Sequence, residues 1–280
     1  MFTKTEEKQI VAHGLTVDQV QQQTERFSKG FPAITLARAA TTGDGIIKPA
    51  PGQSEEWVNY YNEQSQGLNI VKFVPASGAA TRMFKHLHAF RNDAIDRGVE
   101  TALMDENHKL TKGFFTNLDR FAFYPLLSKT VLERGIPVPP ATEHYLEILS
   151  ILLDEGGFSF SQKPKALIPF HRYGNVTRLA IEEQLVEGAR YGKGASGKAY
   201  LHFTIPPGTA AEFDRILGEL LPLYSNKYQT EYEVSYSIQK PSTDTIAVTP
   251  DNQPFRDAGG NLLFRPGGHG ALIHNLNDID

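Results

Sequence analysis

The spacing of apolar and polar residues changes partway along the chain. The N-terminal part is mostly polar with apolar residues at helical spacing, and Thr16 with Gln19 three residues later is the pattern of a helix-capping box. Residues 68–74 (LNIVKFV) form a short apolar run rich in β-branched side chains, which predicts a buried strand. The small residues of 75–80 follow, and a helical pattern begins at Thr81. This order of strand, small-residue loop and helix is typical of the first unit of a nucleotide-binding α/β domain.

The middle of the chain is predicted to be a helical insertion, because apolar residues recur at helical spacing from residue 84 to about 160. Strand-like and helix-like patterns alternate after it. The expected strands are 166–170, 199–205 and 231–238, the expected helices are 177–190 and 209–223, and two shorter strand candidates lie at 245–248 and 262–264. This alternation predicts an α/β fold with a mostly parallel sheet and helices on both faces. We expect the strand at 68–74 to be central in that sheet, with the three other long strands beside it.

The predicted elements suggest an N-terminal helical segment, 1–67, and an α/β core, 68–280, that carries the helical insertion. The chain has 280 residues, of which 40% are hydrophobic and 21% charged, so it can bury a core. Its net charge of −4 gives no general attraction for nucleic acid, which argues against a nucleic-acid partner. No run of eighteen apolar residues and no N-terminal export signal occurs, so we expect a cytoplasmic protein without a membrane partner.

Cysteine is absent from the chain. This excludes disulfides, thiolate zinc sites, iron–sulfur clusters and thiol nucleophiles. No H-E-x-x-H motif and no regular spacing of His, Asp and Glu occurs, so no dedicated metal cage is predicted and metal ligands stay unassigned. His202 lies within an apolar strand pattern, where a single histidine is expected to be a core residue. No G-x-S-x-G elbow occurs, which argues against an α/β-hydrolase.

The first candidate for chemistry is the loop PASGAATR, residues 75–82. Small residues allow the backbone to approach a ligand closely, and the N–H groups at the start of the next helix favour an anion. Arg82 adds a charge that can bind two phosphate oxygens at once. The loop has neither the ending of a P-loop nor a G-x-G-x-x-G pattern, so by itself it indicates a phosphate site and a plain strand-to-helix turn about equally.

Two further candidates lie later in the chain. Lys165 directly precedes an expected strand and could reach a ligand over the strand ends, although Lys163 and Lys165 also fit two solvated surface lysines. The run 265–270 (RPGGHG) places three glycines around His269, which favours a binding loop over a flexible hairpin. Gln239 follows the expected strand 231–238, at the end where ligand-binding loops of α/β sheets lie.

Taken in order, these motifs resemble those of the sugar-nucleotide pyrophosphorylases, and of UDP-sugar pyrophosphorylases in particular. FVPASGAATRM is similar to their signature loop L-x-G-G-x-G-T-R-L, and PKALIPF to their P-K-G element. YLHFTI, SYSIQKP and LLFRPGGHGALIHNL resemble the strands and glycine loop that follow in those enzymes, so that five elements agree in order across 68–276. The chain is more closely similar, over essentially its whole length, to a bacterial family of unknown function that shares KFVPASGAATRMFK, QKPSTDTIAV and LLFRPGGHGAL.

The pyrophosphorylase resemblance implies a nucleotide-diphospho-sugar-transferase-like fold and a sugar-1-phosphate nucleotidyltransferase. Its substrates would be a nucleoside triphosphate and a sugar phosphate, its products a nucleotide sugar and pyrophosphate, and its cofactor Mg²⁺. Arg82 would steady the leaving pyrophosphate, and Lys165 would neutralise charge on the reacting phosphates. The resemblance implies that the nucleotide is bound by Ser77, Gly78, Ala79, Ala80, Thr81, Gln239, Gly267, Gly268 and His269.

The chain departs from the pyrophosphorylase pattern in three ways. Ser77 and Ala80 stand where the enzymes have glycines, and a long helical stretch separates Arg82 from Lys165. The chain also ends soon after His269, so we expect it to be the N-terminal part of a longer protein. The departures at Ser77 and Ala80 favour the alternative of a non-catalytic nucleotide or sugar-phosphate binding module. A third alternative is a structural or interaction protein, and no motif indicates an oligomeric state.

Overall fold

The computed structural model describes residues 2–194 and 196–279. The chain divides into two compact units. The first unit comprises Met1–Ile70, Lys193–Gly197 and Ser237–Asp280, and the second comprises Val71–Gly192 and Lys198–Tyr236. The expected boundary before residue 68 lies close to the first division, whereas the segment after Tyr236 groups with the N-terminal segment.

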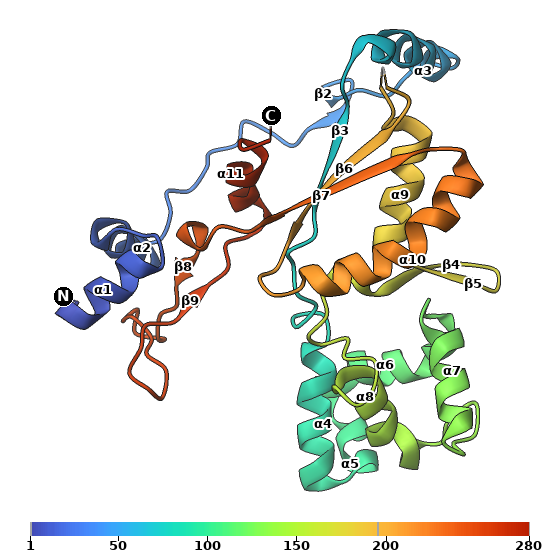
Figure 1. Cartoon of the computed structure of the whole chain (residues 1–280). Coiled ribbons are helices and arrows are strands. Elements are labelled where there is room, and N and C mark those ends of the chain that lie inside the picture. The colour runs from blue at the N-terminus through green and yellow to red at the C-terminus, as the bar shows by residue number, and fades with distance from the viewer. Residues whose placement is uncertain (1, 195, 280) are drawn as a thin grey trace. The chain divides into compact units, whose positions relative to one another are not determined.

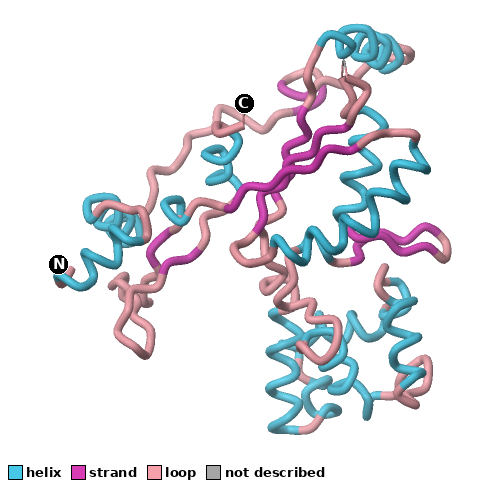
Figure 2. Tube along the Cα trace, viewed as in Figure 1, coloured by secondary structure: helices cyan, strands magenta, loops and turns pink. Residues whose placement is uncertain are grey.

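The second unit contains the expected parallel sheet, which has three strands (Figure 2). These are β3 (Val71–Pro75), β6 (Ala199–Ile205) and β7 (Tyr232–Ile238), in the order β3-β6-β7. β3 pairs with β6 in parallel, with Phe73 opposite His202. β6 contacts the chain first at Glu231 and then, further along β6, at Ser235. These contacts advance in the same direction along β6 and β7, as in parallel pairing.

The prediction that the strand at 68–74 is central was wrong, because β3 is an edge strand and β6 is the middle strand. The side chains show the reason. Six of the seven residues of β6 are buried, as in a strand with neighbours on both sides, whereas Val71 and Pro75 at the ends of β3 are exposed. A run of apolar residues identifies a strand but does not distinguish an edge position from a central one.

The expected strand at 166–170 is also absent from this sheet. Lys165–Leu167 forms a turn of 3₁₀ helix, and β4 (Pro169–Tyr173) pairs antiparallel with β5 (Val176–Leu179) in a separate hairpin. Gly174 turns this hairpin with a φ of 61°. The apolar pattern misled because Leu167 and Ile168 are buried in two different hydrophobic clusters rather than in a strand.

Helices α9 (Ala180–Tyr191) and α10 (Ala210–Tyr228) cover one face of the sheet (Figure 1). Leu185 of α9 and Phe213 of α10 belong to one cluster with Phe203 of β6. The two helices therefore lie on the same face, not on opposite faces as expected. The strand order explains the difference, because two right-handed crossovers that advance in one direction along a sheet place both helices on one side.

The helical insertion is confirmed. Five helices follow β3, and they are α4 (Lys85–Arg97), α5 (Val99–Met104), α6 (Lys109–Thr116), α7 (Tyr124–Glu133) and α8 (Tyr145–Leu153). They enclose a hydrophobic cluster of their own, in which Leu87, Phe90 and Leu152 are fully buried. Ala80 and Ile168 belong to the same cluster, so the segments that enter and leave the helices are anchored to them. We refer to these five helices as the bundle.

The first unit is organised by α1 (Lys4–Ala12) and α2 (Val17–Lys29), which pack on the antiparallel pair β8 (Thr245–Ile246) and β9 (Phe264–Arg265). The expected capping box of Thr16 and Gln19 is confirmed. The carboxamide of Gln9 donates to Leu262 O at 2.7 Å and accepts from Leu262 N at 2.9 Å, which fixes α1 on the chain before β9.

The remaining elements of the first unit are β1 (Thr41–Thr42), β2 (Gly45–Ile46), α3 (Gln53–Gln64) and α11 (Ile273–Leu276). Among the described residues, none of the helices combines the length and the apolar character needed to cross a membrane.

Candidate functional site

The loop after β3 is longer than the sequence suggested. α4 begins at Lys85 rather than at Thr81, so the loop residues are not the first turn of a helix. The N–H of Met83 donates to Ala80 O at 2.8 Å and forms a turn there, while Ala80 and Phe84 are buried in the bundle cluster. The chain therefore uses these residues to enter the bundle, and α4 packs in the bundle instead of covering the sheet.

The loop lies beside the segment that contains Lys165. The N–H of Lys165 donates to Gly78 O at 3.0 Å, and the N–H of Ala80 donates to Lys163 O at 3.3 Å. Ala79 and Pro164 form an antiparallel bridge between these two bonds. Both segments are separate candidates for the site from the sequence. Backbone hydrogen bonds join them, although the whole bundle lies between them in the sequence.

Gly78 and Lys165 line one small cavity of about 170 Å³. Its other lining residues are Val74, Pro75, Ala76, Ala166, Phe170, Ala180 and Gln184. Ala180 is the first residue of α9, so the cavity lies at the helix end that carries positive partial charge. The lining includes one ammonium group and one carboxamide but no carboxylate. We refer to this space as the Lys165 cavity, and its charge suits a small anion.

The other expected residues of the loop are placed differently. Arg82 is exposed, and the hydroxyl of Thr81 donates to Ser161 O at 3.3 Å. Ala80 is fully buried, and its N–H is already bonded to Lys163 O. Ser77 is half-buried, and Ala79 is exposed. Of the six, Gly78 is the one that lines the Lys165 cavity.

The second expected group of residues is assembled in the first unit. The carboxamide of Gln239, which is buried, donates to Gly267 O at 2.9 Å. A Cβ at Gly267 would lie 2.6 Å from Thr243 O, so only glycine allows the two loops to approach this closely. Gly268 and His269 are exposed. Gln239 and Gly267 therefore fix the glycine loop, while the two residues after them face outward.

Asn275 was not identified from the sequence, although it holds this region together. It is buried, and its side-chain amide donates to Ser237 Oγ and Ile238 O, both at 2.9 Å. Its Oδ1 has no partner among the described residues. Nearby, Lys240 and Asp278 form an ion pair at 2.5 Å. The only sequence signal was a single asparagine among the apolar residues at the start of α11.

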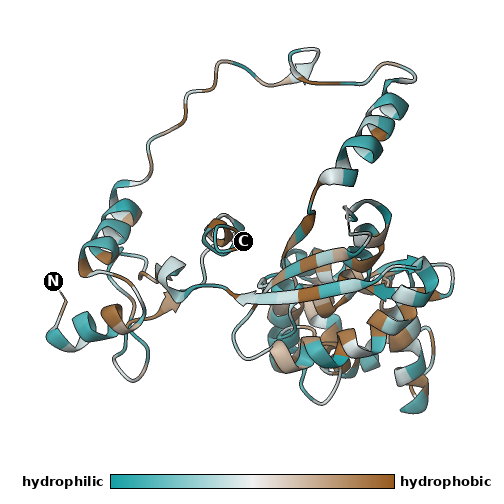
Figure 3. Cartoon of the chain, turned by 45° about the horizontal axis from the view of Figure 1, so that its top comes forward, coloured by the Kyte–Doolittle hydropathy of each residue, from teal (hydrophilic) through white to brown (hydrophobic). Residues whose placement is uncertain are grey.

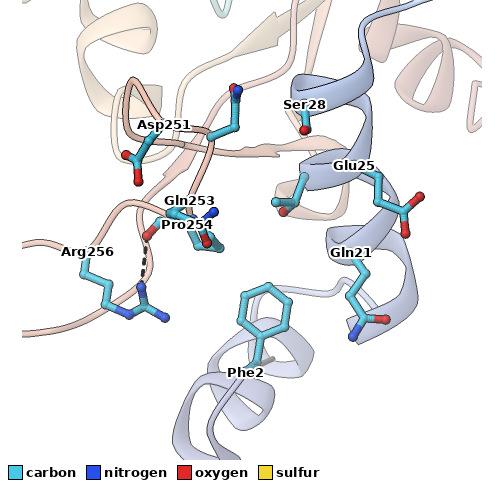
Figure 4. A pocket seen from close by; sticks show the side chains of 10 residues that line it. Phe2, Gln21, Glu25, Ser28, Asp251, Gln253, Pro254 and Arg256 are labelled. Carbon is cyan, nitrogen blue, oxygen red and sulfur yellow. Dashed lines mark hydrogen bonds between the residues drawn. The ribbon is translucent and has the colours of Figure 1, made fainter.

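A larger and polar cavity of about 560 Å³ lies in the first unit, between α2 and a loop before β9 (Figure 4). It is lined by Phe2, Gln21, Thr24, Glu25, Ser28, Asp251, Asn252, Gln253, Pro254 and Arg256. Arg256 is held there by bonds to Pro254 O at 3.0 Å and to Glu6 at 2.6 Å. No motif in the sequence predicts this site, and the one signal is the row of polar residues along α2.

The magnesium ion implied by the pyrophosphorylase resemblance stays a prediction. Mg²⁺ is held in proteins by one or two carboxylates together with water and substrate phosphates. No carboxylate lines the Lys165 cavity, and within residues 2–194 and 196–279 no three His, Asp or Glu residues are grouped to hold a metal ion. These residues do not fit a magnesium site, so no step of the chemistry below passes through a metal.

Comparison with known proteins identifies the family of the chain. Neither a curated protein nor a solved structure matches it. A family model matches residues 3–280, which is nearly the whole chain, and confirms the similarity to a family of unknown function. The chain therefore belongs to the family described as "domain of unknown function (DUF4301)".

Proposed function

We propose that the loop 77–82 and Lys165 bind the phosphates of a nucleoside triphosphate, and that the protein is a sugar-1-phosphate nucleotidyltransferase. The observation that carries the proposal is the meeting of Gly78 and Lys165. They are joined by a backbone hydrogen bond of 3.0 Å, and they line the same cavity. The cavity has a cation and a helix N-terminus but no carboxylate in its lining, and this combination favours a phosphate group.

In the proposed reaction, a phosphate oxygen of the sugar 1-phosphate attacks the α-phosphorus of the triphosphate in line. The bond from the α-phosphorus to the bridging oxygen breaks, and pyrophosphate leaves with that electron pair. The ammonium of Lys165 offsets the negative charge gathered at the phosphates, and Arg82 binds the leaving pyrophosphate. Catalysis of this kind requires positioning and charge neutralisation rather than a covalent intermediate.

That Gln239 and the glycine loop bind the nucleotide stays a prediction from the sequence. Because the carboxamide of Gln239 is bonded to Gly267 O, it sets the loop in place rather than contacting a base directly. Gly268 and His269 are the exposed members of the group.

The test is a calorimetric titration of the full chain with UTP, ATP, CTP and GTP in a magnesium buffer. We expect one triphosphate to bind, and we expect Lys165→Met to weaken it at least tenfold, because losing a charge-assisted contact costs about 1.5–3 kcal/mol. The matched control is Lys112→Met, a change of an exposed lysine on α6 that does not line the Lys165 cavity. If no triphosphate binds, or if both variants bind alike, the phosphate site is wrong.

A pyrophosphate-release assay with the bound triphosphate and glucose 1-phosphate, galactose 1-phosphate or mannose 1-phosphate then separates the two functional alternatives. Release that depends on a sugar phosphate and falls with Arg82→Ala supports the transferase. Binding that depends on Lys165, without release for any sugar phosphate, supports the non-catalytic binding module.

A further inference from the structure

A second cavity lies in the second unit, apart from the Lys165 cavity. Its volume is about 720 Å³, and it lies between the bundle and β4. It is lined by Met83, Phe84, His86, Leu87, Lys109, Leu110, Gly113, Phe114, Asn117, Phe121, Ala122, Phe123, Ile168, Pro169 and Phe170. Five of these are phenylalanines. We refer to this space as the bundle cavity.

The size and lining of the bundle cavity are those of a ligand site rather than of a packing defect. Protein interiors are close-packed, and voids larger than a few water molecules are rare in them. Sites for small molecules typically measure about 300–1,000 Å³ and are lined mostly by apolar side chains with a few polar groups. Leaving such a surface in water is unfavourable in free energy, and an apolar ligand would remove it from water.

The polar groups of the bundle cavity indicate the charge of its ligand. They are His86, Lys109 and Asn117, and no carboxylate is among the lining residues. Burial lowers the pKa of the His86 imidazole, so at neutral pH this ring is uncharged and the Lys109 ammonium carries the positive charge. Lys109 is exposed, and within the described parts of the chain it forms no ion pair. A negative group at this point would therefore meet an unpaired cation.

We propose that the bundle cavity binds an amphipathic anion, a molecule whose hydrocarbon chain lies among the phenylalanines and whose anionic end meets Lys109. The apolar lining accounts for the chain, and the unpaired ammonium accounts for the anionic end. This site is separate from the one in the proposed function, because Lys165 and Gly78 are not among its lining residues. Phe170 lines both cavities, so the experiment must also establish which lysine holds the anionic end.

The first measurement is calorimetric titration of the full chain with hexyl, octyl and decyl phosphate, each below its micelle concentration, and with inorganic phosphate. Each methylene moved from water into an apolar site is expected to raise the affinity about fourfold. We expect the affinity to rise in this way from hexyl to decyl phosphate. If alkyl phosphates bind no more tightly than inorganic phosphate, the proposal is overturned.

A variant that fills the cavity gives the second measurement. A Cβ at Gly113, in α6, would have no atom within 4 Å, so a leucine side chain there would extend into open space at the cavity wall. Gly113→Leu should weaken decyl phosphate binding at least tenfold. Gly218→Leu is the matched control, because Gly218 is also in a helix and also open, but does not line the bundle cavity. Both changes replace a helical glycine and so favour folding, and equal binding by the two variants would overturn the proposal.

The anionic end is tested with Lys109→Gln, using decyl phosphate and the uncharged decanol as probes. We expect this variant to bind decyl phosphate three- to tenfold more weakly and to bind decanol as the unmodified chain does. Lys112→Met, a change of an exposed lysine that does not line the bundle cavity, should leave both affinities unchanged. If Lys165→Met weakens decyl phosphate and Lys109→Gln does not, the assignment of the anionic end to Lys109 is wrong.

Discussion

The bundle helices and α3 of the segment 31–67 both carry apolar residues, but their surroundings are very different. Helices of the bundle bury their apolar residues in a shared cluster, and Phe90, Ile148 and Leu152 are completely inaccessible. The segment 31–67 includes α3, which also carries apolar side chains but has no buried residue, and Ser65 is the only buried residue in the whole segment. Figure 3 shows apolar positions in brown along the chain that leads to α3.

The difference shows that amphipathic spacing specifies a helix but not its partner. In the bundle, five helices follow one another with short connections, so each apolar face meets the next. The segment 31–67 has one helix after an extended stretch, and it offers no second apolar face for that helix to contact. Burial therefore depends on how many neighbouring elements share the pattern, and it is this dependence that mutations can test.

The largest effect is expected from the same substitution made in each region. Leu152→Ala, at a residue with 0% exposure, should lower the free energy of unfolding by about 2–5 kcal/mol, because it leaves a cavity in the bundle. Leu36→Ala, at a residue with 76% exposure, should change it by less than about 0.5 kcal/mol. Urea unfolding followed by circular dichroism measures both. Similar values for the two variants would contradict the comparison.

Two adjacent glycines test how closely the backbone of the bundle is packed. A Cβ at Gly157 would lie 2.0 Å from Ile151 O, whereas a Cβ at Gly156 would have no atom within 4 Å. Gly157→Ala should therefore destabilise the protein by about 1–3 kcal/mol, since the chain must shift to relieve the overlap. Gly156→Ala is the control and should have little effect. Thermal unfolding of the two variants is the measurement. A Gly157→Ala protein as stable as the Gly156→Ala protein would show that the chain after α8 can move freely.

An arginine–aspartate pair from each region can be compared at acid pH. Arg91 binds Asp154 at 2.6 Å in the bundle and lowers the pKa of that carboxyl, and Arg38 lowers the pKa of Asp44 in the segment 31–67 in the same way. A lowered pKa in the folded state means that the pair stabilises the protein fully above the ordinary value of 3.8. This stabilisation is lost as the pH falls below 3.8 through the folded value.

Of these two pairs, we expect only Arg91 with Asp154 to affect acid stability measurably. Asp154→Asn should remove less than about 1 kcal/mol at pH 7, because the carboxylate is 43% exposed and screened, and the difference from the unmodified chain should shrink as the pH falls below 3.8. Asp44→Asn should follow the unmodified chain at every pH, because its pair is exposed and joins residues close in sequence. A pH series of urea unfolding midpoints makes the comparison, and an equal effect of the two variants would contradict it.

These comparisons show which structural features of the molecule can be predicted from the sequence. The strands β3, β6 and β7, the bundle helices and the capping box at Thr16 follow from local spacing, and the structure confirms them. The edge position of β3 and the shared face of α9 and α10 depend on the order of strands, which no local pattern records.

Some residues of the candidate site could likewise be selected from the sequence, and others could not. Gly78 and Lys165 could be selected because small residues and lysines beside strands suit phosphates, and the structure brings these two together. The bundle cavity and the buried Asn275 were missed, because both arise from contacts between residues far apart in the chain. Apolar residues that line a cavity and those that fill a core have the same pattern in the sequence.

The smallest effect concerns Trp57, the only tryptophan of the chain, which lies in α3 and is 60% exposed. We expect acrylamide to quench its fluorescence almost as strongly in the folded protein as in urea, and we expect Leu152→Ala to leave this quenching unchanged. A tryptophan placed in the bundle by Phe115→Trp, in a Trp57→Phe background, is the buried control, because Phe115 is 8% exposed. Strong shielding of Trp57 that grows with protein concentration would show that a second copy of the chain covers α3. In that assembly another molecule would cover the apolar side chains of α3. The contrast between the two regions would then hold for the single chain only.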